Sequence, residues 1–193
     1  MSHRVVLMTG CARGIGLATA ARFARAGDTV VATVRDASRA EELRRALDAA
    51  TEVVGAAGQG PASSGEAASA VEALDVTDGK AVQQLVDDTV ARHGRIDVLI
   101  SHAGRSVVGT LEDLEDDDLR SSFEVNFLGG ARVIRAVLPS MRAAGSGRIL
   151  ALSSMAGVIG NPFNDAYAMA KFALEGLFES LAPVVEQKVS QLA

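Results

Sequence analysis

The chain has a single tyrosine, and it lies one helical turn before a lysine. Tyr167 and Lys171 occupy positions i and i+4 of the segment 165–187, whose apolar spacing predicts a helix. Residues four apart project from the same face of a helix, so the phenol and the ammonium would lie side by side. A phenol exchanges protons poorly at neutral pH, and a neighbouring ammonium stabilises the phenolate. The pair suits general acid–base catalysis, although a surface Tyr–Lys pair without function has the same spacing.

Two further polar residues fall where a predicted element presents them to a cleft. Ser154 follows the predicted strand 148–153 and stands 13 residues before Tyr167. At the carboxyl end of a parallel strand, its hydroxyl would face the crevice where open α/β sheets bind ligands. The adjacent Ser153 is interpreted as a strand-end or turn serine. Asn126 interrupts an apolar stretch of a long predicted helix, and a satisfied buried amide is its other interpretation.

A glycine-rich turn joins the first predicted strand to the first predicted helix. Residues 9–16 read TGCARGIG. Gly10 permits a tight turn, Gly14 lets the backbone approach a pyrophosphate, and Gly16 allows close packing of helix on strand. The helix N-terminus adds free N–H groups and a partial positive charge. The context predicts a dinucleotide site, and a glycine-rich turn without a ligand is the alternative.

These motifs are separated by alternating strand and helix patterns. Strands are predicted over 4–9, 29–34, 71–74, 96–101 and 148–153, and helices over 16–26, 39–50, 80–93, 115–144 and 165–187. The fourth helical stretch is expected to be two helices that meet near Ser121, and Pro183 is expected to kink or stop the last one. Such alternation implies right-handed crossovers and a parallel sheet covered on both faces. The segment 55–70 is predicted to be a flexible surface excursion.

Composition limits the class of protein. The 193 residues, 48% hydrophobic and 22% charged, predict one globular domain over 1–193. A net charge of −5 disfavours nucleic-acid binding, and no apolar tract is long enough to predict a membrane span. The N-terminus resembles a strand and not a signal peptide. The single cysteine, Cys11, excludes an internal disulfide, leaves too few thiols for structural zinc and favours the cytoplasm. The acidic run 112–118 is interpreted as a helix start, so no metal site is predicted.

The glycine spacing, TGxxxGIG, resembles that of the classical short-chain dehydrogenase/reductase family. The resemblance extends over nearly the whole chain to about Glu186. The segments TGCARGIG, IDVLISHAG and GNPFNDAYAMAKFALEGLFESLAP are most similar to the branch of 17β-hydroxysteroid and retinol dehydrogenases. The resemblance implies a Rossmann-type doubly wound parallel sheet flanked by helices. It also implies that four residues are catalytic: Asn126, Ser154, Tyr167 and Lys171.

The resemblance implies hydride transfer between a nicotinamide and a carbinol or carbonyl carbon. Tyr167 would exchange the proton with the substrate oxygen, and Ser154 would hydrogen-bond that oxygen. Lys171 would bind the nicotinamide ribose and stabilise the phenolate, and Asn126 would hold a water that links Lys171 to solvent. The substrate would be a secondary alcohol or ketone, of an apolar steroid or retinoid type. The alternatives are a 3-oxoacyl or polyketide ketoreductase with the same groups, and a non-catalytic nucleotide-binding protein.

The end of the second predicted strand bears on the choice of cofactor. Relatives that prefer NAD usually have an aspartate at the position of Val34, and here Arg35 follows it. Arg13 and Arg35 would attract a 2′-phosphate, which implies NADP(H) over NAD(H), unless both are solvated surface charges. Asp75 matches the family's adenine-contacting acid, with a plain turn aspartate as the alternative. The cofactor-binding residues implied are Gly10, Arg13, Gly14, Ile15, Gly16, Arg35, Asp75, Val76, Ala103, Gly104, Tyr167 and Lys171.

The chain departs from the family pattern at His102 and at its C-terminal residues, and its long helices suggest a dimer. His102 stands where the family has an asparagine, and a structural role is expected for it. The residues 188–193 do not predict the family's next strand, so its C-terminal strands and substrate lid are expected to be missing after about residue 187. A homodimer through the helices of Asn126 and Tyr167 is expected, because both helices have apolar positions beyond those that cover one sheet. These positions are Phe123, Phe127, Val133, Val137, Phe172, Leu174, Leu177, Phe178 and Leu181.

Overall fold

A parallel sheet forms the centre of the molecule. The computed structural model describes residues 3–56, 69–186 and 191–192. Within these ranges the strands are β1 (Val5–Met8), β2 (Thr29–Val34), β3 (Ala70–Ala73), β4 (Val98–Ser101), β5 (Arg148–Ala151) and β6 (Gln191–Leu192). Every pair is parallel, in the order β3-β2-β1-β4-β5-β6. The order reverses between β1 and β4, which confirms the predicted doubly wound Rossmann-type sheet.

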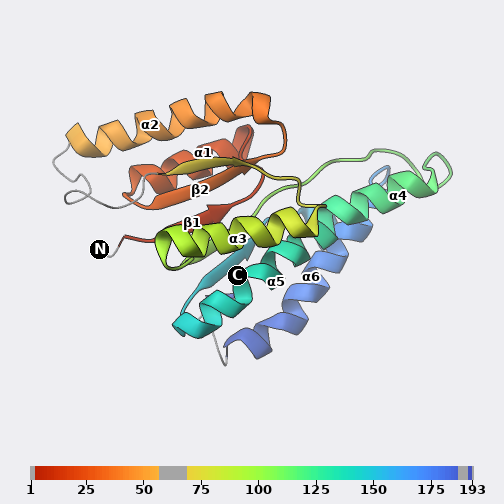
Figure 1. The fold of residues 1–193 in the computed structure, drawn as a ribbon. Helices are drawn as coiled ribbons and strands as arrows, with labels where there is room; N and C mark the ends of the chain where they lie inside the picture. The colour runs from red at the N-terminus through yellow and green to blue at the C-terminus, as the bar shows by residue number, and fades with distance from the viewer. Residues whose placement is uncertain (1–2, 57–68, 187–190, 193) are drawn as a thin grey trace.

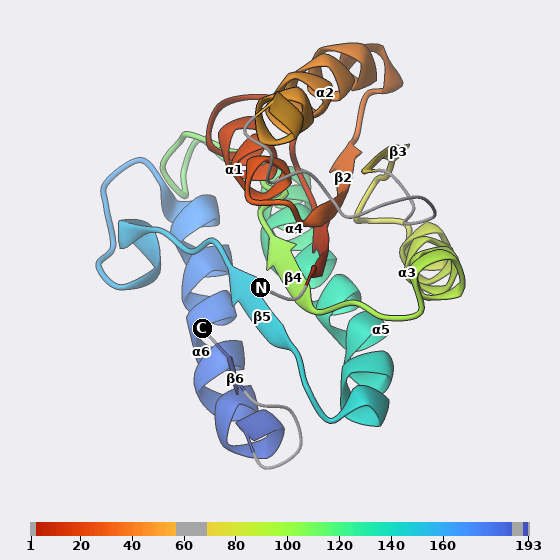
Figure 2. The ribbon, with the colours of Figure 1, turned by 90° about the vertical axis from the view of Figure 1, so that its left-hand side faces the viewer.

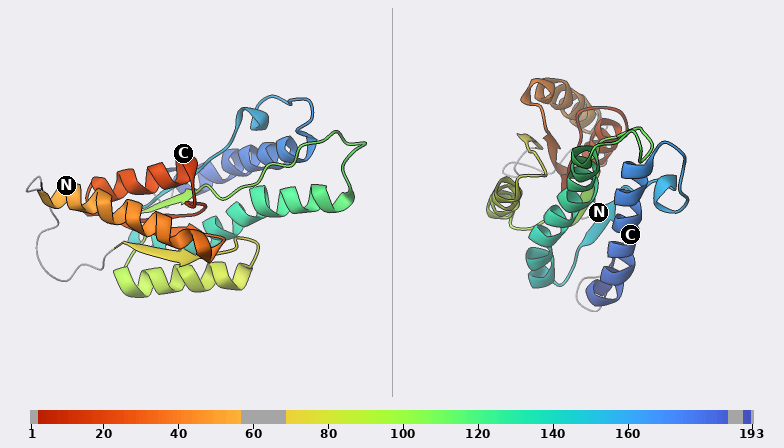
Figure 3. Two further views of the ribbon diagram at one scale, coloured as in Figure 1. Left: turned by 90° about the horizontal axis from the view of Figure 1, so that it is seen from above. Right: turned by 90° about the vertical axis from the view of Figure 1, so that its right-hand side faces the viewer.

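Helices cover both faces of this sheet. They are α1 (Gly14–Arg25), α2 (Ala40–Ala56), α3 (Gly79–His93), α4 (Asp116–Phe123), α5 (Gly129–Ala144) and α6 (Asp165–Glu186). Figure 1 shows α1 and α2 on one side of the sheet and α3, α5 and α6 on the other. The views of Figure 2 and Figure 3 show the same two layers from the end and from above. None of the described helices is long and apolar enough to cross a membrane.

The core forms because successive side chains of a strand point to opposite faces. In β1, Val6 and Met8 pack with α1 and α2, whereas Leu7 between them packs with α3 and α5. All four residues of β1 are buried, as are all four of β4. Strands buried on both faces need continuous apolar runs, which is the pattern that predicted them.

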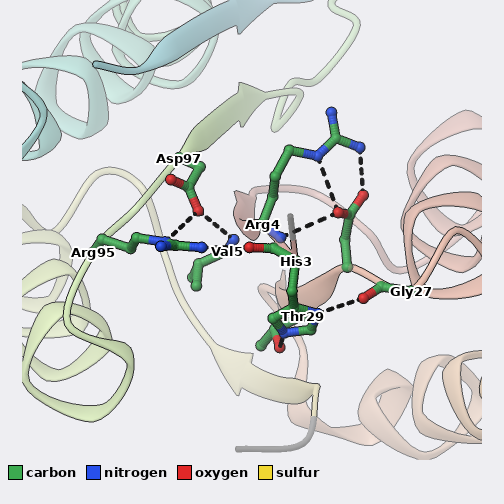
Figure 4. A network of polar contacts seen from close by, with 8 residues as sticks. His3, Arg4, Val5, Gly27, Thr29, Arg95 and Asp97 are labelled. Atoms are coloured by element: carbon green, nitrogen blue, oxygen red, sulfur yellow. Dashed lines mark hydrogen bonds and ion pairs between the residues drawn. The ribbon is translucent and has the colours of Figure 1, made fainter. Parts of the chain in front are cut away.

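The amino end of the sheet is closed by a network of charged side chains, drawn in Figure 4. Arg4 donates from Nε and Nη2 to the two carboxylate oxygens of Asp28, at 3.0 and 2.6 Å. The Asp97 carboxylate accepts from the backbone N–H of Val5 at 2.7 Å and from Nε of Arg95 at 2.9 Å. These contacts fix the first residues of β1 to the start of β2 and to the segment before β4.

Three details differ from the prediction. The fourth helical stretch consists of two helices, as predicted, but they meet after Ser121: α4 continues to Phe123 and then passes through a π turn, Glu124–Leu128, into α5. Pro183 does not stop α6, which runs to Glu186. The residues 191–192 form a short strand beside β5, so the expectation of no strand after residue 187 was wrong at this point.

Two further expectations are refined. Since α2 extends to Ala56 and β3 begins at Ala70, the predicted excursion shortens at both ends, and most of it lies outside the described residues. Val133, Val137 and Leu174 are 1, 0 and 4% exposed and belong to the core. These three positions therefore cannot contribute to a dimer interface, contrary to the expectation.

Candidate active site

The turn after β1 is tied to the end of β4. Thr9 Oγ1 accepts hydrogen bonds from the backbone N–H groups of His102 and Ala103, each at 3.1 Å. The ring Nδ1 of His102 pairs with the carbonyl oxygen of Gly10 at 3.0 Å, and because a carbonyl only accepts, Nδ1 carries the proton in this contact. His102 thus braces the glycine-rich turn, which is the structural role expected for it.

Close contacts require glycine at positions 10 and 16 of this turn, whereas Gly14 borders open space. A Cβ on Gly10, whose φ is +76°, would lie 2.7 Å from Cα of Ala103, and a Cβ on Gly16 would lie 2.9 Å from Nδ1 of His102. Gly14, at φ +56°, has nothing within 4 Å of its Cβ position. The left-handed backbone at Gly10 and Gly14 also favours glycine.

The start of α1 fits an anionic group such as a pyrophosphate. Arg13 is the N-cap residue, and no side chain caps the helix there. The first turn, which contains Ile15, has no acidic residue, so its N–H groups and the helix dipole face solvent without a competing charge. The open space at Gly14 lets such a group reach these N–H donors. The residues present therefore fit the diphosphate of a dinucleotide.

Oppositely charged residues, Arg35 and Asp75, lie directly after β2 and shortly after β3. Val34 is fully buried, whereas Arg35 is exposed directly after it. The pKa of Asp75 is lowered below its ordinary range by hydrogen bonds from the backbone and hydroxyl of Thr77, at 2.9 and 2.7 Å, and by the charge of Arg35. Asp75 is therefore a turn aspartate in this structure, and it also lies in the field of Arg35.

The side chain of Asn126 is buried in the π turn and fully engaged within the protein. Its Oδ1 accepts from the backbone N–H of Arg105 at 3.0 Å. Its Nδ2 donates to the carbonyl oxygens of Arg105 and Ser122, at 2.9 and 3.0 Å. The amide thus clamps the chain just after Gly104, where a Cβ would lie 2.8 Å from Oδ1. In this arrangement the side chain has no free N–H for a water, so the satisfied-amide interpretation describes it.

Lys171 is buried, 6% exposed, on the face of α6 that also bears Tyr167. Its Nζ donates to the carbonyl oxygen of Leu152 at 2.7 Å and lies 5.7 Å from the centre of the Tyr167 ring. Burial lowers the pKa of Lys171 below its ordinary range, and the charge of Glu175 opposes that shift. Leu152 is two residues before Ser154, so Lys171 joins the tyrosine helix to the strand end that carries the serine.

The two serines after β5 differ in environment. Ser154 is half-buried and caps the short 3₁₀ turn Met155–Gly157, where its Oγ accepts from Ala156 N–H at 3.2 Å. The Oγ of Ser153 is buried with no hydrogen-bond partner among the described residues. It faces Gly157, at which a Cβ would lie 2.7 Å from that oxygen. Ser154 is therefore the serine that caps the turn, whereas the hydroxyl of Ser153 is buried and unpaired among the described residues.

Comparison with known proteins shows the family of the chain. A model of the short chain dehydrogenase family matches residues 4–190. The chain belongs to this family. It is 42% identical over 188 residues to human 17-beta-hydroxysteroid dehydrogenase type 1, covering 94% of this chain and 52% of that protein. It is 39% identical over 185 residues to human retinol dehydrogenase 8, covering 93% of this chain and 53% of that protein. The chain spans about half the length of these relatives.

Solved structures are similar over nearly the whole chain. NAD⁺-bound xylitol dehydrogenase gives a TM-score of 0.84 at 29% identity and covers 96% of this chain and 66% of its own. An alcohol dehydrogenase from the archaeon Thermococcus sibiricus, complexed with 5-hydroxy-NADP, gives 0.83 at 26% identity, with 99% and 74% covered. The solved structures similar to this chain accordingly include both an NAD⁺ complex and an NADP-type complex.

Beside these family motifs, the segment after β4 is fastened to the start of α6. Gly109 donates its N–H to the carbonyl oxygen of Phe163 at 2.9 Å, and Leu111 N–H donates to Asp165 Oδ2 at 2.9 Å. Phe163 adopts φ +64°, a strained conformation for a residue with a side chain. The left view of Figure 3 shows this segment running out beside α6 before it turns back into α4.

One predicted site residue packs into the core, and several other residues at the site were not predicted from the sequence. Val76, a predicted cofactor residue, is buried against Gly129, where a Cβ would lie 2.5 Å from its Cγ2. Leu152 and Arg105 contribute backbone atoms only, so no side-chain signal marks them. Ser122 hydrogen-bonds both Asn126 and α6, and its only sequence signal is its place four residues before Asn126.

Proposed function

We propose that the chain is the nucleotide-binding and catalytic part of an NADP(H)-dependent oxidoreductase that interconverts a secondary alcohol and a ketone. The observation that carries the proposal is the buried Lys171 ammonium, which contacts the Tyr167 ring and the Leu152 carbonyl. No carboxylate among the described residues lies within ion-pair distance of it. The Glu175 charge acts on it only from beyond ion-pair distance, so the buried ammonium costs stability, and its presence beside a tyrosine favours a catalytic use.

In the reducing direction, Tyr167 gives its hydroxyl proton to the carbonyl oxygen of the substrate. Ser154 Oγ–H hydrogen-bonds the same oxygen and stabilises the charge that develops there. Lys171 stabilises the phenolate that remains on Tyr167 until the proton is restored from solvent. The nicotinamide nucleotide, when bound, supplies the hydride. Asn126 holds the Arg105 backbone and thereby the loop that follows β4.

The substrate class rests on apolar side chains at the carboxyl end of the sheet. Exposed apolar residues on the two segments that flank the site are Val108, Leu111, Met155, Val158, Ile159 and Phe163. Such side chains favour an apolar substrate over a sugar or an acid. The named hydroxysteroid and retinol dehydrogenases, to which the chain is similar, support a steroid- or retinoid-like molecule.

The test is NADPH oxidation by the full chain against a panel of carbonyl compounds. The panel contains 17-ketosteroids, retinaldehyde, short ketones and 3-oxoacyl thioesters, and the Tyr167→Phe variant sets the background. Turnover of the ketosteroids or retinaldehyde supports the proposal, whereas turnover of the thioesters alone favours the ketoreductase alternative. Cofactor binding without turnover of any compound would favour the non-catalytic nucleotide-binding protein.

The NADP(H) preference rests on Arg13 and Arg35. Both are exposed at the rim of the glycine turn and of β2, and neither has an ion-pair partner among the described residues. Each charge-assisted bond to a 2′-phosphate contributes about 1.5–3 kcal/mol. Arg13→Ala with Arg35→Ala should therefore weaken NADPH binding and leave NADH binding nearly unchanged. Equal losses for both nucleotides would show that the arginines do not bind the phosphate.

We also propose a homodimer through α6 and the helical stretch of Asn126, which comprises α4, the π turn and α5. Phe172 and Met169 on α6 are 45 and 42% exposed. The rings of Phe123 and Phe127 are tilted against each other, with 4.7 Å between their centres. An exposed apolar stripe on a helix is suited to a two-fold interface. Light scattering at micromolar concentration should give a dimer mass, and a charge at Phe172 (Phe172→Glu) should give a monomer. A monomer mass for the unaltered chain would refute the dimer.

The cytoplasmic location remains a prediction from cysteine content. Cys11 is buried, and burial raises the pKa of its thiol to about 12. A protonated, buried thiol is chemically inert, which suits a structural role in a reducing compartment.

A further inference from the structure

A buried hydroxyl on α4 connects two of the proposed catalytic elements. Ser122 is 0% exposed. Its Oγ donates to the carbonyl oxygen of Ala166 on α6, at 3.0 Å, and accepts from Nδ2 of Asn126 at 3.2 Å. Ala166 immediately precedes Tyr167. A single oxygen thus touches both the asparagine side chain and the backbone that carries the tyrosine.

The contact with Asn126 is reinforced by the backbone of the same residue. The carbonyl oxygen of Ser122 accepts from Asn126 Nδ2 at 3.0 Å. Asn126 in turn pairs with both backbone groups of Arg105. The result is a continuous series of hydrogen bonds from α6, through Ser122 and Asn126, to the loop after β4.

The chemistry of a hydroxyl fixes the direction of this series. A serine hydroxyl has one hydrogen, and a carbonyl oxygen can only accept, so the hydrogen of Ser122 goes to Ala166. Toward Asn126 the hydroxyl must then act as an acceptor. This agrees with the backbone contacts, which already place the NH₂ group of the amide toward Ser122 and its oxygen toward the N–H of Arg105. The reversed amide would leave an N–H group opposed to a donor, at a buried position where that is costly.

We propose that Ser122 is a positioning residue for the reaction, which rests on the function proposed above. Its hydroxyl ties α6, at the residue before Tyr167, to the Asn126 amide, whose orientation the backbone groups of Arg105 and Ser122 already fix. Loss of the hydroxyl would loosen this tie without removing any atom that touches substrate or nucleotide. Because catalytic geometry tolerates little displacement, the effect should fall on turnover and not on nucleotide binding.

The chain contains a matched control and a specific probe. Ser121 lies one residue earlier on α4, and its Oγ makes only a local bond, to the carbonyl oxygen of Asp118 at 3.1 Å. Tyr167 is the only tyrosine, and the chain has no tryptophan, so tyrosine emission reports on Tyr167 alone. This probe needs neither a substrate nor a nucleotide.

The experiment compares Ser122→Ala with Ser121→Ala in the full chain. In Ser122→Ala, acrylamide should quench Tyr167 emission more strongly than in the unaltered chain, and kcat should fall about tenfold. The NADPH dissociation constant should stay unchanged, and Ser121→Ala should match the unaltered chain in every measurement. Ser122→Cys, which keeps a weaker donor of similar size, should lie between the two.

Two results would overturn the proposal. One is unchanged quenching and unchanged kcat in Ser122→Ala. The other is an equal loss in Ser121→Ala, which would reveal a general effect on α4. If no carbonyl compound is turned over by the unaltered chain, the proposed function fails, yet the quenching comparison still decides whether Ser122 holds Tyr167. If Ser122→Ala does not fold, the Ser122→Cys comparison decides the same point.

Discussion

The charged groups at the amino end of the parallel sheet are paired with one another, whereas the buried charge at the carboxyl end has no ion pair among the described residues. At the amino end, Arg4 is paired with Asp28 and Arg95 with Asp97, and the Asp97 carboxylate also accepts a strand N–H (Figure 4). At the carboxyl end, the buried Lys171 has one backbone acceptor, at Leu152, and no described ion pair. There the Oγ of Ser153 has no partner at all among the described residues.

The difference separates groups that hold the fold from groups kept available for a ligand. The charges at the start of β1 are paired and stabilise the sheet, although the buried Nε2 of His93 near His3 has no hydrogen-bond partner among the described residues. Unpaired polar groups at the opposite end cost stability, and such costs are typical of functional sites. The comparison therefore predicts that substitutions at the carboxyl end change turnover and binding, whereas those at the amino end change stability.

The largest effect is expected for Tyr167→Phe. The variant loses the hydroxyl that exchanges the proton, and general acid–base groups contribute about a hundred- to ten-thousandfold to rate. Carbonyl reduction followed by NADPH absorbance should fall by about this factor. The free energy of unfolding and the NADPH dissociation constant should stay near those of the unaltered chain. Retention of most of kcat would show that Tyr167 is not the acid–base group.

At the amino end, Asp28→Ala should destabilise the chain by about 2 kcal/mol, because it removes a hydrogen-bonded partner of Arg4. Urea unfolding measures this change. The control is Glu41→Ala, which removes exposed ion pairs to Arg44 and Arg45 at 3.8 and 3.5 Å and should have little effect. NADPH affinity should be the same in both variants. A selective loss of NADPH affinity in Asp28→Ala would contradict the claim that substitutions at the amino end change only stability.

A smaller change in the free energy of unfolding is expected from Lys171→Met, and it depends on pH. Burial lowers the pKa of Lys171 below its ordinary 10.5, so between the two values the unfolded chain binds more protons than the folded one. The free energy of unfolding should therefore rise with pH across that window, and the cost of the buried charge is fully present below it.

Lys171→Met should abolish that rise and leave stability at neutral pH equal or higher by about 1 kcal/mol, while turnover is lost. The control is Lys80→Met, since Lys80 is exposed on α3 and should alter neither property. Urea unfolding at several alkaline pH values makes the comparison. A less stable Lys171→Met chain that keeps the alkaline rise would refute this account of Lys171.

The smallest effect is expected for His102→Asn. Asparagine can also donate to the Gly10 carbonyl, which His102 Nδ1 contacts at 3.0 Å, so NADPH affinity should change less than about threefold. His102→Ala removes the donor and should weaken NADPH binding by about tenfold, which corresponds to one hydrogen bond. Isothermal titration separates the two. Equal losses in both variants would show that the ring itself, and not its donor, supports the turn.

Elements with strong local patterns could be predicted from the sequence. The runs of β-branched residues predicted β1 and β2, because strands buried on both faces require apolar residues throughout. The glycine turn was predicted because the left-handed backbone at Gly10 favours glycine. The i, i+4 spacing of Tyr167 and Lys171 placed both on α6, as the structure has them.

The rest depends on tertiary contacts that leave no periodic pattern. The π turn at Glu124–Leu128 coincides with the clamp that the Asn126 amide makes on Arg105, a partner 21 residues away. The bond from Lys171 to Leu152 uses a backbone oxygen, and β6 is only two residues long. In each case the partner is a main-chain group or a distant segment, so the residue types near it could not indicate the contact.

The most direct test of the central claim uses the light emitted by Tyr167. If the nicotinamide lies beside this residue, NADPH should quench tyrosine emission saturably, and excitation of the tyrosine should produce dihydronicotinamide emission. The Tyr167→Phe variant, which still binds NADPH, supplies the background. The account predicts energy transfer with the same dissociation constant that calorimetry gives for NADPH. NADPH binding without energy transfer, or no binding at all, would contradict a catalytic site at the carboxyl end of the sheet.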